Sequence, residues 1–258
     1  MRDANSWFRS GAATHVGKVR QHNEDSFLVL AKSGVWAVAD GMGGHAAGDV
    51  ASRTVVEELK QISAPSSVSD LLASFEDRVV AANDRLKQLS ESRGWGTVGT
   101  TVAALLIYEE FFACVWAGDS RIYRARKSQI EQLSVDHTEV QQLVETGTIT
   151  AEEARSWPGR NVITRAIGAD DSPELEMLHG TLEPGDAFVI CSDGLTNHVS
   201  DQEILAAVLR YSPQAACDDL IGLTLSRGAS DNVTVIVVRF DPAASTVLPG
   251  VTHSGLIG

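Results

Sequence analysis

The sequence of 258 residues contains 43% hydrophobic residues and only seven prolines, so it can bury a large core and does not have the composition of a disordered chain. Its formal net charge is −13, from 34 acidic and 21 basic residues. A field of that sign repels nucleic acid and anionic lipid, which argues against functions that depend on binding either of them.

Apolar, β-branched segments predict strands from the N-terminus onward. Two of these segments, 188–191 and 233–238, are apolar at odd and even positions alike, which indicates that both of their faces are covered. The link Glu109-Glu110 is so short that only antiparallel neighbours can use it. The full set of expected strands is 11–19, 26–30, 35–40, 100–108, 111–118, 122–126, 187–192 and 233–240.

Helices are expected between these groups of strands, because apolar residues recur there at spacings of three and four. The longest such pattern runs from Leu72 to Leu89, and a shorter one from Ala51 to Ile62 precedes it. Two further helical patterns follow Asp201. Each pattern has a single apolar stripe, so we expect these helices to form outer layers.

Outer helices and doubly covered strands together predict an α+β fold, a four-layer α-β-β-α sandwich of two mainly antiparallel sheets flanked by helices. We expect residues 1–240 to form a single domain. Residues 137–165 are polar and helical in pattern, which predicts an inserted flap. Residues 241–258 carry Pro242 and Pro249 without any periodicity, so we expect a disordered tail there.

Cysteine usage and hydropathy bear on the cellular compartment. Cys114, Cys191 and Cys217 are odd in number, have no paired spacing and lie in apolar runs. We therefore expect buried thiols, and neither disulfides nor a zinc site. The N-terminus has no apolar leader region, and no stretch reaches the ~18 apolar residues that span a bilayer. These features predict a monomer in the reducing cytoplasm.

Two acidic signatures combine carboxylates with small neighbours. The first is Asn23-Glu24-Asp25 followed by Asp40-Gly41-Met42-Gly43-Gly44, and the second is Ser192-Asp193-Gly194 followed by Ser230-Asp231-Asn232. Carboxylates ligate hard divalent cations, and glycine allows a backbone carbonyl to approach them. The pattern predicts a metal site. Two cations close together would lower the pKa of a shared water and clamp a phosphoryl group for in-line attack.

A longer series of motifs carries a family resemblance. In chain order they are Gly17-Lys18-Val19-Arg20-Gln21-His22-Asn23-Glu24-Asp25, Asp40-Gly41-Met42-Gly43-Gly44, Gly99-Thr100-Thr101, Gly118-Asp119-Ser120-Arg121, Ser192-Asp193-Gly194 and Asp231-Asn232. This series resembles the bacterial metal-dependent serine/threonine protein phosphatases of the protein phosphatase 2C (PPM) family. The match spans residues 11–240. A lone Asp-Gly pair is uninformative, but motifs in this order are difficult to obtain by chance.

The resemblance implies a set of metal ligands. Asp40 would bridge two Mg2+ or Mn2+ ions, with Glu24 and the Gly41 carbonyl on one ion and Asp193 and Asp231 on the other. Asp25 would orient metal-bound waters from outside the ligand set.

The resemblance also implies a phosphate-binding residue and a third metal. Arg20 is expected to contact the substrate phosphate, because a guanidinium fork matches two phosphate oxygens; the alternative is a surface arginine without a role. Asp119 resembles the aspartate that joins Asp193 at a third, weaker metal, and the alternative is an Asp-Ser turn. Asn197 replaces an acid found in some relatives, so we expect that third site to be weak.

The general acid departs from the family pattern. Several relatives have a histidine where this chain has Met42, which cannot transfer a proton. His45 is close in sequence, but we expect a metal-bound water to be the acid instead. We expect His137 to order the entrance of the flap rather than to catalyse.

The function that these observations favour is a metal-dependent phosphatase acting on phosphoserine and phosphothreonine in signalling proteins, the substrates of a cognate serine/threonine kinase. A catalytically silent phosphoprotein-binding module of the same fold is the alternative from another class. A two-metal nuclease or nucleotide phosphohydrolase would share the acids, but a nuclease is disfavoured by the negative charge and by the lack of a basic, aromatic-lined groove. Gly43-Gly44 lacks the spacing and the lysine of a nucleotide-binding loop.

Overall fold

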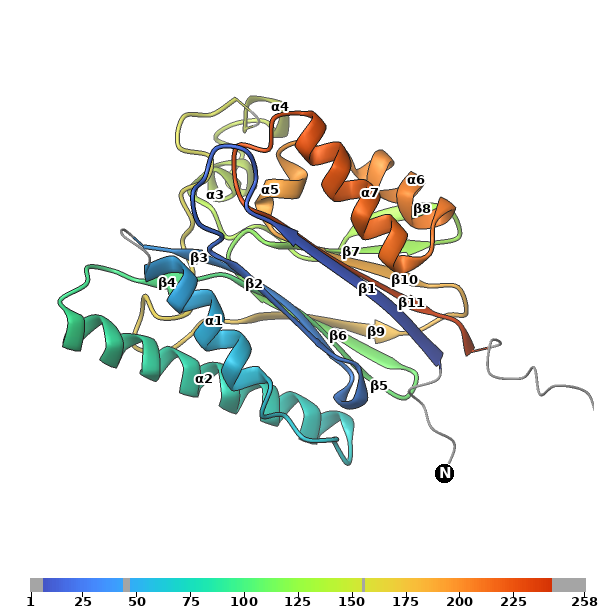
Figure 1. Cartoon of the computed structure of the whole chain (residues 1–258), viewed down its shortest axis with the longest axis horizontal. Coiled ribbons are helices and arrows are strands. Elements are labelled where there is room, and N and C mark those ends of the chain that lie inside the picture. The colour runs from blue at the N-terminus through green and yellow to red at the C-terminus, as the bar shows by residue number, and fades with distance from the viewer. Residues whose placement is uncertain (1–6, 44–46, 155, 243–258) are drawn as a thin grey trace, which may run out of the picture.

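A computed structural model describes residues 7–43, 47–154 and 156–242. Two antiparallel sheets lie face to face, and helices cover both outer sides (Figure 1). This arrangement confirms the predicted α+β sandwich of four layers. The expected tail, 241–258, lies outside the described residues from residue 243 onward, and the single domain of residues 1–240 stays a prediction.

The two sheets contain strands from both halves of the chain. The first sheet has the order β1 (Phe8–His15), β11 (Val233–Phe240), β10 (Ala187–Cys191), β7 (Arg121–Arg126) and β8 (Gln129–Gln132). The second has the order β2 (Asp25–Leu30), β3 (Val35–Met42), β5 (Val102–Tyr108), β6 (Phe111–Ala117) and β9 (Glu176–Thr181). The short β4 (Gly99–Thr100) also pairs with β3, and η2 (Ala31–Ser33) joins β2 to β3.

The helices form the outer layers, as predicted from their single apolar stripes. One outer layer consists of α1 (Ala47–Leu59) and α2 (Val68–Arg93), and the other of α6 (Asp201–Arg210) and α7 (Pro213–Ser226) (Figure 1). The short α5 (Asp193–Thr196) follows β10 directly, and α3 (Glu139–Glu145) and α4 (Ala151–Ala154) lie within the expected flap.

Three apolar clusters fill the spaces between the layers. Trp36 and Phe188 belong to the cluster between the two sheets, Phe75 to the one under α1 and α2, and Leu220 to the one under α7. All four side chains are fully buried or nearly so. Strands β10 and β11 are buried on both faces, apart from Arg239, which confirms the reading of their apolar runs.

Local signals in the sequence set several helix boundaries. Ser67 caps α2 by accepting a hydrogen bond from the Asp70 N–H, and Gly94 ends that helix with φ of 62°, a conformation that glycine adopts easily. Ser200 and Glu203 form a reciprocal capping box at the start of α6.

The structure differs from the expected elements in β1, β8, β9 and α5. β1 runs from Phe8 to His15 rather than over 11–19, because Gly17 has φ of 81° and turns the chain out of the sheet. Strands β8 and β9 and the single turn α5 were not predicted.

Cys114, Cys191 and Cys217 are free and buried, as expected. Within the described ranges no helix is long and apolar enough to cross a membrane.

Candidate functional site

The acids of the two sequence signatures meet at one end of the sandwich. Asp25 and Asp40 are partners in the register between β2 and β3. Asp193 directly follows Ser192 at the end of β10, and Asp231 lies just before β11, which is antiparallel to β10. The antiparallel pairing therefore brings the end of one strand and the start of the other to the same edge.

Asp25 joins the two sheets through hydrogen bonds. Its Oδ2 accepts from the hydroxyls of Ser192 at 2.8 Å and Thr234 at 2.7 Å, both in the opposite sheet. Its Oδ1 is buried and has no hydrogen-bond partner among the described residues. Burial raises the pKa of Asp25 to about 6, although the two hydroxyls oppose the shift. An unpartnered buried carboxylate oxygen fits a hard cation or a water bound to one.

The backbone of Asp40 is fixed by two threonines. Its N–H donates to Thr101 Oγ1 at 3.0 Å, and its carbonyl accepts from Thr100 Oγ1 at 2.9 Å. Thr101 Oγ1 also lies 2.8 Å from Ser120 Oγ, which links Asp40 to the turn that carries Asp119. Burial raises the pKa of Asp40 well above its ordinary value, and the nearby carboxylates of Asp25 and Asp193 raise it further.

Glu24 and Gly41 lie together at the start of α1. The Gly41 N–H donates to the Glu24 carbonyl at 3.1 Å. A Cβ at Gly41 would lie 1.9 Å from the Gly48 carbonyl oxygen, and one at Gly48 would lie 2.6 Å from Glu24 Oε1. Both glycines are therefore required for this close approach. Burial raises the pKa of Glu24, and Arg20 opposes that shift.

Asp119 and Asp193 extend the acidic group toward the flap. Burial raises the pKa of Asp119 to about 7, and repulsion from Asp193 and Asp136 contributes. Burial also raises the pKa of Asp193, as does the carboxylate of Asp231. Such shifts are typical of functional sites, and bound divalent cations would offset the repulsion that causes part of them.

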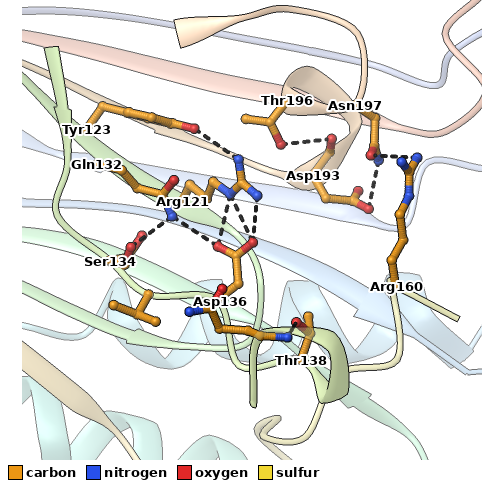
Figure 2. Close-up of polar contacts among 12 residues, drawn as sticks. Arg121, Tyr123, Gln132, Ser134, Asp136, Thr138, Arg160, Asp193, Thr196 and Asn197 are labelled. Atoms are coloured by element: carbon orange, nitrogen blue, oxygen red, sulfur yellow. Dashed lines mark hydrogen bonds and ion pairs between the residues drawn. The ribbon is translucent and has the colours of Figure 1, made fainter. Parts of the chain in front are cut away.

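Arg20 lies beside the acids, where its Nη2 donates to Asp231 Oδ2 at 2.7 Å. Asp193 Oδ2 accepts from Asn197 Nδ2 at 3.0 Å (Figure 2). In the part of the chain that the structure describes, no group of three or more His, Cys, Asp or Glu side chains is already arranged to enclose an ion. The fit to a cation depends instead on the all-oxygen donor set and on the unpartnered Asp25 Oδ1.

A cavity of about 840 Å³ adjoins Asp119 and Asp193 and separates the flap from α5 and α6. At its floor the half-buried Arg121 donates to Asp136 Oδ1 at 2.9 Å and to Asp136 Oδ2 at 2.6 Å (Figure 2). Burial lowers the pKa of Arg121, but the bonds to Asp136 outweigh that effect and raise it. The flap contributes an apolar wall made of Val140, Val144, Ala151 and Ala154.

Among the described residues, the candidate histidine His137 makes its contacts at the turn before Asp119 and on Trp116. His137 Nδ1 accepts from the Gly118 N–H at 3.1 Å, and its ring stacks on Trp116. Burial lowers the pKa of His137, and the nearby carboxylate of Glu176, whose Oε1 lies 3.3 Å from Nε2, opposes that shift. The Met42 side chain packs near Gly99, where an added Cβ would lie 2.9 Å from Met42 Cε. His45 lies outside the described residues.

Sequence reasoning missed the residues that hold the ligand-bearing segments. Asn232 was noted only as part of a motif, yet its Oδ1 accepts from the Glu24 N–H at 2.7 Å. Its Nδ2 donates to the carbonyls of Val16 and His22, both at 2.9 Å. The short Asp-Asn signal marked the position, but nothing in the sequence indicated which loop the amide would bind.

Comparisons with known proteins identify the family and the fold. The sequence profile of the Protein phosphatase 2C family matches residues 14–219. The serine/threonine protein phosphatase PstP of Mycobacterium tuberculosis is 41% identical over 231 residues, which are 89% of this chain and 44% of that protein. This chain therefore spans less than half the length of that relative.

Solved structures are similar as well. A crystal structure of the M. tuberculosis phosphatase PstP/Ppp has a TM-score of 0.86 and 38% identity, and the match covers 91% of this chain and 99% of that one. A structure of the catalytic domain of PstP in complex with two manganese ions has a TM-score of 0.81 and 38% identity, over 91% of this chain and 98% of that one.

Proposed function

This chain belongs to the protein phosphatase 2C family, and on that premise we propose that it is a metal-dependent hydrolase of phosphoserine and phosphothreonine in proteins. The observation that carries the proposal is the convergence of Asp25, Asp40, Asp193 and Asp231 from separate segments at one edge of the sandwich. Burial raises the pKa of Asp25, Asp40 and Asp193, and neighbouring carboxylates of the same group raise each of them further, a pattern typical of functional sites.

The donor set fits two divalent cations, which we take to be Mn2+ or Mg2+. Asp40 would contact both ions. Glu24 and the Gly41 carbonyl would complete one site, and Asp193 and Asp231 the other. The manganese-bound PstP structure supports this choice of cofactor. When bound, the cations supply a water of lowered pKa and positive charge for the phosphoryl oxygens.

The protein's own residues would then hold the substrate and the waters. Arg20 lies next to Asp231, where its guanidinium fork can donate hydrogen bonds to two phosphate oxygens. Asp25, anchored by Ser192 and Thr234, would orient water through its free Oδ1. Asp119 and Asp193 would share a third cation, held weakly because Asn197 contributes no charge there.

The substrate class follows from the space beside the acids. The cavity of about 840 Å³ is large enough for residues that flank a phosphorylated side chain, which favours a protein over a free phosphate ester. The names of the similar phosphatases support the same class. We further propose that the enzyme acts in the cytoplasm on the products of a serine/threonine kinase.

The deciding experiment measures hydrolysis of a small aryl phosphate and of a phosphothreonine peptide with Mn2+ and with excess chelator. Activity should vanish with chelator and return with Mn2+. Asp40→Asn and Asp193→Asn should each lose at least about a hundredfold in kcat, because the activated water depends on both carboxylates. Asp77→Asn, an exposed position on the outer helix α2, is the matched control and should retain full activity.

Two results would contradict the proposal. Full turnover in excess chelator would exclude metal-dependent hydrolysis. A protein that binds phosphopeptide tightly but hydrolyses neither substrate with Mn2+ would be the silent binding module instead.

A further inference from the structure

His198 connects the two segments that carry Asp193 and Asp231. It lies in the turn after α5, whose first residue is Asp193. Its Nε2 accepts from the Ser230 N–H at 3.3 Å and lies 3.4 Å from Ser230 Oγ, and Ser230 directly precedes Asp231. A single side chain therefore spans the gap between the two acids' backbones.

The segment that His198 contacts is conformationally unusual. Between α7 and β11, Gly228 has φ of 111° and the buried Ala229 has φ of 38°. A residue with a Cβ rarely adopts positive φ, and such a conformation persists only where the surroundings fix it. One fixing contact is the Lys18 N–H, which donates to the Ala229 carbonyl at 2.9 Å. His198 supplies another at the next residue.

The backbone of His198 is itself held by Arg227. Arg227 Nη1 donates to the His198 carbonyl at 2.6 Å and to Glu203 Oε2 at 2.9 Å, and Nη2 donates to Glu203 Oε1 at 2.5 Å. Glu203 is fixed in turn by the capping box that it forms with Ser200. Arg227 thus ties the end of α7 and the start of α6 to the turn that follows α5.

We propose that His198, held in place by Arg227, is a positioning residue that sets the distance between Asp193 and Asp231. The inference depends on the proposed function, because it concerns two carboxylates that would ligate a cation. Neither His198 nor Arg227 touches the reacting atoms. A divalent cation accepts oxygen ligands only within a few tenths of an ångström, so a small movement of one loop should weaken its binding.

The test compares His198→Ala, His198→Gln and Arg227→Met. Calorimetric titration of the metal-free proteins with Mn2+ should show about tenfold to hundredfold weaker binding for His198→Ala and Arg227→Met, the range seen when outer contacts of metal ligands are removed. The side-chain amide of His198→Gln reaches the position of Nε2, so this variant can still accept from Ser230 and should recover part of the affinity. Turnover of aryl phosphate should fall at low Mn2+ and recover at saturating Mn2+.

Arg126→Met is the matched control for loss of an ion pair. Arg126 makes a similar two-pronged contact with Asp186, at 2.7 and 2.6 Å, but at the opposite end of β7 and β10 from the acids. This variant should lower the melting temperature while leaving Mn2+ affinity unchanged. If Arg227→Met fails to fold, Arg227→Lys keeps the charge and gives the same comparison.

Wild-type Mn2+ affinity in His198→Ala would overturn the proposal. The contacts of His198 and Arg227 would then serve only to pack α6 and α7 together. Equal loss of affinity in Arg126→Met and Arg227→Met would do the same, since the effect would then be one of general stability. Wild-type Mn2+ affinity in Asp193→Asn is a different outcome, because it would contradict the proposed function itself.

Discussion

At the scale of single residues, Asp25 combines a structural role with the proposed chemical one. One oxygen accepts from Ser192 and Thr234 and so joins the sheets, while the other remains buried and unpartnered. A carboxylate used only as a structural link would have partners on both oxygens. The asymmetry fits the proposed role of Asp25 in orienting water bound to a cation.

The raised pKa values predict how the stability of the metal-free protein depends on pH. The pKa of Asp25 is raised from 3.8 to about 6, and that of Asp119 from 3.8 to about 7. Between about pH 4 and pH 7 the folded chain therefore holds protons that the unfolded chain has released, so stability falls as pH rises through this window. Thermal unfolding in chelator should show a lower melting temperature at about pH 7.5 than at about pH 5.

Added Mn2+ should reverse this fall at the higher pH, because the ionised carboxylates bind it. Asp25→Asn should flatten the pH dependence, and Asp77→Asn should leave it unchanged. Carboxyls with a lowered pKa, such as Glu203 beside Arg227, lose their contribution only in more acid solution, outside this window. A melting temperature that rises from pH 5 to 7.5 in chelator would contradict the prediction.

Arg20 carries a second prediction at this scale. Arg20→Ala should raise KM for phosphopeptide about tenfold and change kcat less. The reason is that the lost contact would hold the phosphate equally in the bound substrate and in the transition state. Mn2+ affinity should stay the same or increase, since Asp231 loses the cation that bonds to it at 2.7 Å. Steady-state kinetics and calorimetry on the same samples measure both. Lys18→Ala, which removes a nearby exposed cation, is the control. An unchanged KM in Arg20→Ala would show that Arg20 is a surface residue that does not bind the substrate phosphate.

At the scale of elements, a substitution in the expected flap, residues 137–165, tests whether this segment contacts the substrate. Val144 is partly exposed on α3 and contributes to the apolar wall of the cavity. Val144→Asp should raise KM for phosphopeptides severalfold, since a charge replaces apolar contact area, and should leave KM for a small aryl phosphate unchanged. Gln142→Asp adds the same charge at an exposed neighbour outside the cavity wall and is the control. Equal effects on both substrates would contradict recognition by the flap.

The elements that could be predicted were those with a repeating apolar pattern. The long helix α2 and the buried strands β10 and β11 carry that pattern in their own sequence. By contrast, β9 is exposed at most of its residues and exists because its backbone pairs with β6, a contact between distant segments. The four-residue β8 and α5 are too short to show a period.

In the candidate site, too, features that show in a short stretch of sequence differ from features that depend on contacts between distant segments. The short motifs singled out the acids that the structure brings together at one edge of the sandwich, whereas their roles and that of Arg20 stay predictions. The contacts that position the acids could not be predicted, since Asn232 binds the loop around His22 and Arg121 binds Asp136 across long separations in sequence. Such partners depend on the completed topology rather than on local pattern.

At the scale of the whole molecule, the site lies where the two sheets meet. The candidate ligands Glu24 and Asp40 belong to the second sheet or its edge, whereas Asp193 and Asp231 flank strands of the first. Cations held by both groups would cross-link the two halves of the sandwich. Binding free energy is therefore also folding free energy, which is why Mn2+ should raise the melting temperature.

The net charge of −13 gives a prediction about substrates. A negative field draws cationic peptides toward the molecule and repels anionic ones, and added salt screens it. For phosphopeptides flanked by Lys and Arg, kcat/KM should fall as NaCl rises from about 20 to about 200 mM, while for peptides flanked by Asp and Glu it should rise.

Glu152→Lys, an exposed position on the flap, should weaken the preference for basic flanks. Glu110→Lys makes the same charge change in the turn between β5 and β6, far from the acids, and should weaken it less. Identical salt dependence for the two kinds of peptide would show that substrates are selected by contacts in the cavity alone.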